Sequence, residues 1–252
     1  MEPFYAVKRN PDPVIVRTLA ILGANFDCAS RAEIRLVKQV SQDLSRQPEI
    51  IYANPCKARS HMIEAVCKGV NLVTFDNAME VAKCAAVSKK IKLVMRIVTD
   101  DKGSVCRLSS KFGAHRHMWR TNLAAAKKHG LEVVGVSFHV GSGCRDASRY
   151  ELALRDAKEI FTFAKEEFGF DMNIVDIGGG FPGETHSIWN PADLDSSVED
   201  DEEEDDDEEK DDITARTDEP LMFFSDIAEK FRIVLDELFP EDSDACLIAE
   251  PG

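Results

Sequence analysis

The feature of this sequence that most constrains its fold is a regular alternation of short apolar segments with segments of helical periodicity. Eight short segments rich in β-forming residues lie at 4–8, 25–29, 49–54, 71–76, 92–98, 132–140, 172–178 and 245–250. Helix-period segments lie between them at 13–22, 30–42, 58–68, 77–88, 118–129, 147–167 and 219–237. This alternation is typical of parallel βαβ units. Eight units in 252 residues predict an α/β fold, a closed TIM (β/α)8 barrel, with a doubly wound open sheet as the alternative.

The composition argues against a membrane-spanning or a secreted protein. At 44% hydrophobic residues the chain can build one large core, and no apolar run reaches the roughly 18 residues that span a membrane. The start of the chain has no basic region followed by an apolar one, so we expect no secretory signal. The seven cysteines are odd in number and form no CxxC pair. We therefore expect reduced thiols and a cytoplasmic protein.

The net charge of −15 arises mostly from one segment, residues 199–212, which holds thirteen acids and one lysine. Without it, 30 basic residues face 33 acidic ones, and no basic surface for nucleic acid is indicated. Like charges at this density bury no apolar surface. We expect an acidic, disordered insertion over about 196–216 within a barrel domain of 1–252, and a docking tail for a basic partner is the alternative.

Polar residues or glycines end every predicted strand. In TIM barrels the carboxyl ends of the strands carry the chemistry. Any one of these residues is explained equally well by a strand leaving the core, but the full set shares one face. In chain order the set is Lys8, Asp27, Asn54, Asp76, Arg96, His139, Gly178–Gly180 and Glu250.

Two glycine-rich turns follow predicted strands. The turn at 178–183 follows the seventh strand, where many barrels bind phosphate through backbone N–H groups, although a simple tight turn fits it as well. The second turn, at 139–144, adds the hydroxyl of Ser142. A phosphate site, a strand-end lysine, a histidine and a carboxylate on one rim suggest pyridoxal 5'-phosphate, which forms a Schiff base with lysine.

Long segments of the chain resemble eukaryotic ornithine decarboxylases, pyridoxal-phosphate enzymes with the alanine racemase type of barrel. The resemblance covers residues 3–252 apart from the acidic segment. It is carried by PFYAVKRN, NFDCASRAEI, IYANPCK, LVMRIVTDDKGSVCRLSSKFGA, GVSFHVGSGC, VDIGGGFPG and IAEPG.

The resemblance implies a role for each matching residue. It implies that Lys8 holds the cofactor as an imine and that His139 stacks on its ring; both are expected to be catalytic. It implies phosphate and ring contacts from Ser142, Gly179, Gly180 and the stretch Glu250, Pro251 and Gly252. Asp27, Glu33 and Arg96 are similar to polar residues that line the pocket. No metal is implied.

Glu250 carries the expected chemistry. A carboxylate beside the pyridine nitrogen keeps that nitrogen protonated and makes the ring a strong electron sink, which suits decarboxylation. The related racemases have an arginine there. The implied reaction converts L-ornithine to putrescine, in polyamine biosynthesis, by a homodimer.

The chain departs from the family pattern at both ends. The resemblance implies a phosphate-binding arginine after Gly252 and a carboxy-terminal β domain that supplies a cysteine acid and an aspartate for the distal amine. We therefore expect a truncated chain that does not turn over ornithine by itself. Two other functions stay open: a non-catalytic regulator like the antizyme inhibitors, which bind antizyme, and a decarboxylase for lysine, arginine or diaminopimelate.

Overall fold

Eight parallel strands close into a barrel in the computed structural model, which describes residues 1–100, 104, 109, 111–142, 144, 146–181, 224–240 and 243–252. The strands follow one another around the barrel in chain order, and β8 pairs with β1. The predicted TIM barrel is confirmed, and the open-sheet alternative is wrong. The strands are β1 (Glu2–Ala6), β2 (Asn25–Cys28), β3 (Ile50–Tyr52), β4 (Leu72–Phe75), β5 (Lys92–Arg96), β6 (Glu132–Ser137), β7 (Ile174–Asp176) and β8 (Cys246–Ala249).

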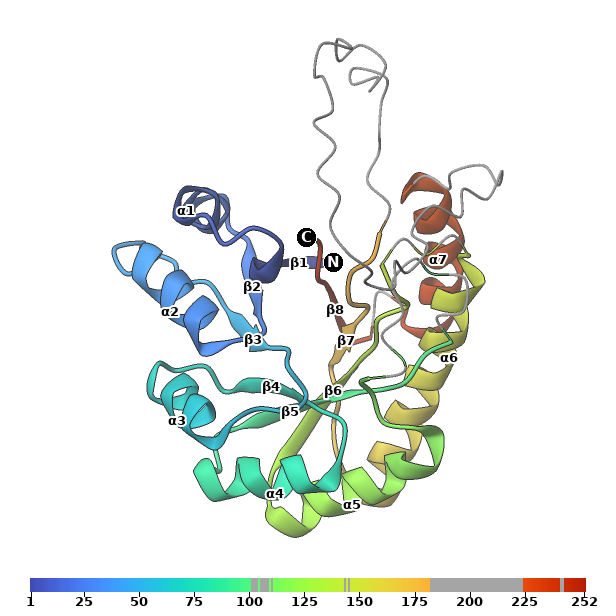
Figure 1. Cartoon of the computed structure of the whole chain (residues 1–252). Helices are drawn as coiled ribbons and strands as arrows, with labels where there is room; N and C mark the ends of the chain where they lie inside the picture. The colour runs from blue at the N-terminus through green and yellow to red at the C-terminus, as the bar shows by residue number, and fades with distance from the viewer. Residues whose placement is uncertain are drawn as a thin grey trace, which may run out of the picture.

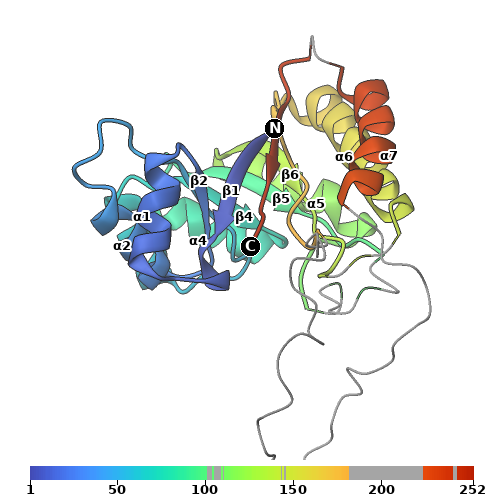
Figure 2. The same cartoon turned by 90° about the horizontal axis from the view of Figure 1, so that it is seen from above.

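Helices surround the strands on the outside (Figures 1 and 2). Their starts follow local sequence signals. For example, the Asp12 side chain accepts the N–H groups of Val14 and Ile15, and Pro13 occupies the first turn. The helices are α1 (Pro13–Ile21), α2 (Arg31–Val40), α3 (Arg59–Cys67), α4 (Ala78–Val87), α5 (Trp119–His129), α6 (Ser148–Phe163) and α7 (Phe224–Leu238), with short turns at η1 (Val7–Arg9), η2 (Arg116–Met118) and η3 (Ala164–Phe168).

The register of the strands decides which side chains share a layer. Ala6 pairs with Asp27, Arg96 with Ser137, and Ser137 with Asp176. A compact apolar cluster of Phe4, Ile51, Val94 and Ile248 lies apart from the larger core between strands and helices. Because side chains alternate along a strand, Asp176 and Glu250 belong to the same face as Ile174 and Ile248, two residues further toward the carboxyl end.

Two predicted boundaries near the site and in the sixth helical segment change in the structure. The first strand ends at Ala6, so Lys8 lies on the 3-10 turn η1 rather than in the strand. The segment 147–167 divides into α6 and the π-helical turn η3, which is followed by Gly169 with φ +70°. The acidic segment 199–212, and residues 219–223 of the last predicted helix, lie outside the described residues.

An apolar groove of about 660 Å³ lies beside the first and last strands. The side chains lining it come from α7, β8, the ends of the chain and the turn after β7; they include Met1, Pro3, Phe181, Phe224, Phe231 and Leu247. Within the described part of the chain, no helix is both long and apolar enough to cross a membrane.

Candidate active site

Lys8 lies on the turn after β1, at the carboxyl end of the barrel. Its side chain is 57% exposed, and its Nζ is 3.3 Å from Oδ2 of Asp27. Burial lowers the pKa of Lys8, but the Asp27 and Glu250 carboxyl groups outweigh burial and leave that pKa raised. The amine is therefore held as an ammonium by acids and stays reachable from outside.

The last residues of the chain pack against this turn. The Ala6 N–H donates to the Pro251 carbonyl at 2.9 Å. A Cβ on Gly252 would lie 3.1 Å from Cβ of both Ala6 and Arg9. The segment Glu250–Gly252 and Lys8 are thus brought together by the pairing of β8 with β1, as the predicted site requires.

Asp27, on β2, is 1% exposed, and its Oδ1 has no hydrogen-bond partner among the described residues. Burial raises the pKa of this carboxyl against the attraction of Lys8. Arg96 ends β5, with its guanidinium 5.2 Å from the centre of the Phe112 ring. The positive charge of Arg96 affects the pKa values of Lys8, Asp27 and Glu250, so the charges of these four side chains interact with one another.

Two further acids of the site, Asp176 and Glu250, are buried at the ends of neighbouring strands, with exposures of 0% and 8%. Burial, followed by the negative charges of Asp176 and Asp27, raises the pKa of Glu250 well above its usual range. Burial also raises the pKa of Asp176 to about 6, against the N–H that Gly178 donates to its Oδ1. Oδ2 of Asp176 and Oε1 of Glu250 have no hydrogen-bond partner within the described residues.

The two glycine turns pack against each other around His139. A Cβ on Gly180 would lie 2.2 Å from the Gly141 carbonyl oxygen, and one on Gly179 would lie 2.4 Å from that of Glu250. Gly180 also has φ +86°, which favours glycine. The same two added atoms would lie 3.0 and 3.5 Å from atoms of the His139 ring, so the turn after β7 borders the imidazole.

His139 is oriented by its own loop. Its Nδ1 accepts the Gly141 N–H at 3.0 Å, and its carbonyl accepts the Thr99 hydroxyl at 2.9 Å. A ring nitrogen that accepts an N–H carries no proton, so this contact assigns a neutral imidazole. Ser142 lies exposed further along the same loop.

Three other polar residues of the sequence analysis form hydrogen bonds that hold loops and a helix start in place. Glu33 accepts the Ala29 N–H at 2.7 Å and the Ser30 hydroxyl at 2.9 Å, which makes it part of a capping box at the start of α2. Asn54 donates to the Ala29 carbonyl at 3.3 Å, and Asp76 accepts the Gly113 N–H at 3.1 Å. Their positions hold the loops after β2, β3 and β5.

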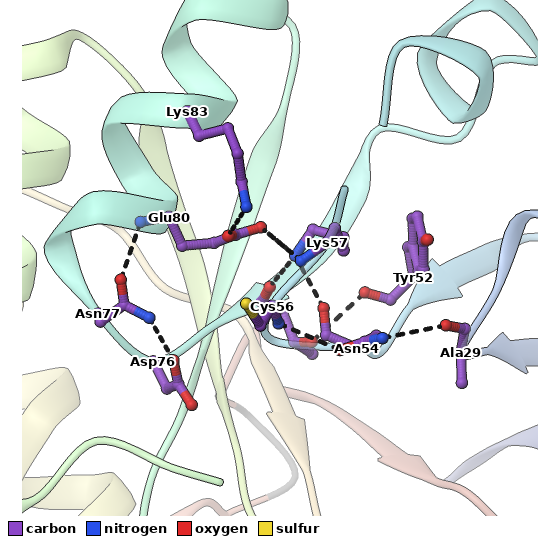
Figure 3. A network of polar contacts seen from close by, with 10 residues as sticks. Ala29, Tyr52, Asn54, Cys56, Lys57, Asp76, Asn77, Glu80 and Lys83 are labelled. Carbon is purple, nitrogen blue, oxygen red and sulfur yellow. Dashed lines mark hydrogen bonds and ion pairs between the residues drawn. The ribbon is translucent and has the colours of Figure 1, made fainter. Parts of the chain in front are cut away.

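A second lysine, Lys57, is buried next to Asn54. Lys57 is 2% exposed, and its Nζ donates to the Asn54 carbonyl at 2.9 Å (Figure 3). It also donates to the Thr74 carbonyl at 2.6 Å. It also forms an ion pair with Glu80 at 3.0 Å. Because Lys57 is itself buried and its amine is occupied by three protein partners, it is unsuited to react with a molecule from outside.

Sequence reasoning assigned no role to Asp176 and missed Ser137, which is 4% exposed and pairs in register with both Arg96 and Asp176. The signal for Asp176 is a charged residue inside the apolar stretch IVDIG. A buried charge without a partner is costly, so such a residue is a candidate for function.

These residues fit pyridoxal phosphate. The site offers a reachable amine on Lys8, and a buried carboxyl oxygen on Glu250 that has no protein donor. Added Cβ atoms on Gly178–Gly180 would collide with neighbouring backbone oxygens, so this turn admits only glycine, as a turn that binds an anion through its backbone requires. An amine, a carboxylate and a backbone anion site match the aldehyde, the ring nitrogen and the phosphate of that cofactor.

Comparison with known proteins agrees with this fit. A family model described as "Pyridoxal-dependent decarboxylase, pyridoxal binding domain" matches residues 1–252. The chain is 42% identical over 250 residues to ornithine decarboxylase of Mus musculus, covering 99% of this chain and 46% of that protein. It is 43% identical over 253 residues to antizyme inhibitor 2 of Xenopus laevis, covering 100% of this chain and 47% of that protein.

Among solved structures, the arginine decarboxylase of Paramecium bursaria Chlorella virus superposes with a TM-score of 0.78 at 33% identity. The match covers 100% of this chain and 58% of that one. The chain therefore spans about half the length of the relatives it matches.

Proposed function

The chain belongs to the family of pyridoxal-dependent decarboxylases, and on that premise we propose that its barrel serves the decarboxylation of L-ornithine to putrescine. One observation carries the proposal: an exposed lysine, Lys8, is ion-paired at 3.3 Å with the buried Asp27 and lies within range of the charge of the buried Glu250 carboxyl. The identity to ornithine decarboxylases across almost the whole chain supports the choice of substrate.

Pyridoxal phosphate, when bound, supplies an aldehyde that condenses with amines and a ring that accepts the electron pair of the broken C–C bond. Lys8 would supply the amine that holds the cofactor. Asp27, 3.3 Å from Lys8 Nζ, orients this amine and can take its proton. Glu250 would hold the ring nitrogen in its protonated form, and the glycine turn after β7 would bind the phosphate.

Two side chains border the rest of the site. The neutral His139, fixed by the Gly141 N–H, would present its ring to the face of the cofactor. Arg96, which stacks on Phe112, balances the charge of the acids.

We also propose that a protein with the full length of its relatives works as a homodimer in the cytoplasm.

Covalent labelling of Lys8 tests the assignment. The protein is incubated with pyridoxal phosphate, reduced with borohydride and mapped by peptide mass spectrometry. We expect the adduct on Lys8 and none on Lys57, whose Nζ is enclosed by three protein partners. Label on another lysine, or cofactor binding without any label, would contradict the role of Lys8.

Substrate turnover tests the activity. We expect carboxyl-labelled ornithine to release CO₂ when the barrel is joined to the carboxy-terminal half of mouse ornithine decarboxylase, and Lys8→Ala to abolish the release. Parallel assays with carboxyl-labelled lysine and arginine show which of the three amino acids is the preferred substrate.

The match to antizyme inhibitor 2 favours a second function, in which the chain binds antizyme without catalysis. The reachable Lys8 and the glycine turn argue for the enzyme. The test uses the barrel joined to the carboxy-terminal half of mouse ornithine decarboxylase. If this protein binds antizyme, but Lys8 is not labelled and no CO₂ is released, the regulatory function is favoured.

A further inference from the structure

The charges of the candidate active site do not balance when all its acids are ionised. Three carboxyl groups are buried there, Asp27, Asp176 and Glu250, with exposures of 1%, 0% and 8%. Among the described residues, the cations facing them are Lys8, on the turn after β1, and Arg96, on β5. His139, from the loop after β6, adds no charge because its Nδ1 accepts an N–H. Within this described part of the chain, three negative charges would thus face two positive ones.

Burial makes such an imbalance expensive. A carboxylate without a counter-ion in an apolar environment takes up a proton instead of staying charged. Asp27 has a cation at 3.3 Å, so it is the acid best able to stay ionised. The extra proton is therefore assigned to Asp176 or Glu250.

Asp176 and Glu250 are arranged as a pair. Ile248, two residues before Glu250, is in register with Asp176 on the neighbouring strand, and the Glu250 N–H donates to the Gly178 carbonyl at 2.7 Å. Gly178 in turn donates its N–H to Asp176 Oδ1 at 3.0 Å. One oxygen of each acid, Oδ2 and Oε1, has no protein partner among the described residues. Two adjacent buried carboxyl groups with unpaired oxygens are suited to share one proton.

We propose that Asp176 and Glu250 hold one proton between them in the protein alone and give it to the ring nitrogen when pyridoxal phosphate binds. The O–H bond of the pair breaks and an N–H bond forms on the ring, with no other reactant. The pair then carries two negative charges, and the protonated ring supplies the third cation beside Lys8 and Arg96. Asp176 is a positioning residue, because it acts through Glu250.

The directions of the pKa shifts agree with this assignment. The pKa of Glu250 is raised by burial and then by the negative charge of Asp176, and the pKa of Asp176 is raised by burial. The part of the inference that concerns the ring nitrogen rests on the proposed function; the shared proton does not.

The first test needs no cofactor. Protein labelled with ¹³C at the Asp and Glu carboxyl carbons is titrated by NMR. We expect the wild-type pair to retain one proton at pH 7, and Asp176→Asn to lower the Glu250 midpoint by at least about one pH unit, since a neighbouring negative charge is removed. Asparagine keeps Oδ1 as acceptor for the Gly178 N–H, so the turn is preserved. If both wild-type acids are ionised at pH 7, the proposal is wrong.

The second test counts protons during cofactor binding. Calorimetry with pyridoxal phosphate at pH 7.5, in buffers of different ionisation enthalpy, gives the number taken up. Asp176→Asn should take up about one proton more than wild type, because its Glu250 has none to give. Asp43→Asn, which changes an exposed acid paired with Arg17, should match wild type in both tests.

The two tests separate the inference from the proposed function. Equal proton counts for wild type and Asp176→Asn overturn the transfer to the ring. If wild type does not bind pyridoxal phosphate, the proposed function fails and the transfer with it. The carboxyl titration then still decides whether the pair holds a proton.

Discussion

Replacing Lys57 by methionine should lower the free energy of unfolding by about 3 kcal/mol, although this residue is outside the candidate active site. The Lys57 amine connects the end of β3, the end of β4 and the start of α4 (Figure 3). Methionine has a similar length, so the substitution removes a charge and three polar contacts while leaving only a small cavity.

The magnitude follows from the partners that remain. Removing one member of a buried ion pair costs about 3–5 kcal/mol, because the other charge is left without compensation. Glu80 is 2% exposed but keeps a second cation, Lys83, at 2.5 Å. The retained contact places the loss at the lower end of that range. A domain stabilised by about 5–15 kcal/mol would lose a large share of its stability.

Urea denaturation followed by circular dichroism measures the loss, and Lys83→Met is the matched control. Lys83 contacts the same carboxylate but is 29% exposed, so we expect it to cost about 1 kcal/mol or less. The double variant Lys57→Met with Glu80→Leu should recover part of the loss, because no buried charge is left alone. A loss for Lys57→Met no larger than that for Lys83→Met would refute the reasoning.

Three further predictions concern the glycine turn, the buried acids and the acidic segment. Gly180→Ala should destabilise the fold by at least about 3 kcal/mol and abolish cofactor binding, because its Cβ would meet the Gly141 oxygen at 2.2 Å. Gly23→Ala, with φ +92° and no atom within 4 Å, should cost only about 1–2 kcal/mol in the same denaturation assay, and equal losses would contradict the steric argument. The free energy of unfolding should fall as the pH rises from about 4 to about 6, because folded Asp176, with its pKa raised to about 6, keeps a proton that the unfolded chain has released. Denaturation curves across this window should be flatter for Asp176→Asn, and an unchanged slope would exclude Asp176 as the source. Deletion of residues 199–212 should change the melting temperature by less than about 2 °C and leave the affinity for pyridoxal phosphate unchanged, because a run of like charges buries no apolar surface; a fall of several degrees would mean that the segment is packed or bound.

Much of the fold was predictable because its signals are local. Each strand is a short apolar run, and the starts of α1, α2 and α4 carry side-chain caps from Asp12, Ser30 and Asn77. Parallel strands end at the same edge of a sheet, so the order of strand-end residues predicted that Lys8, Asp27, Arg96, His139 and Glu250 share one rim.

The functions of individual side chains were less predictable. Glu33 was expected to line the cofactor site; its carboxylate caps α2 while its charge also acts on Asp27, and the sequence did not indicate the first of these roles. Asp176 received no role, because one acid in a strand says nothing about which strand lies beside it. Its significance comes from β8, whose Glu250 is 74 positions later in the sequence.

Two lysines that follow strands, Lys8 and Lys57, differ in a way that the sequence did not predict. Lys8 and Lys57 both come shortly after a short apolar strand, and both precede a helix. Sequence by itself determined the alternation of strands and helices, which puts each of these lysines after a strand. Only the tertiary structure decided that the Lys57 amine is enclosed by Glu80 and two carbonyl groups, while the Lys8 side chain is 57% exposed beside Asp27. The physical reason is that the reactivity of an amine depends on desolvation and on charges from other strands, and closing the barrel sets both.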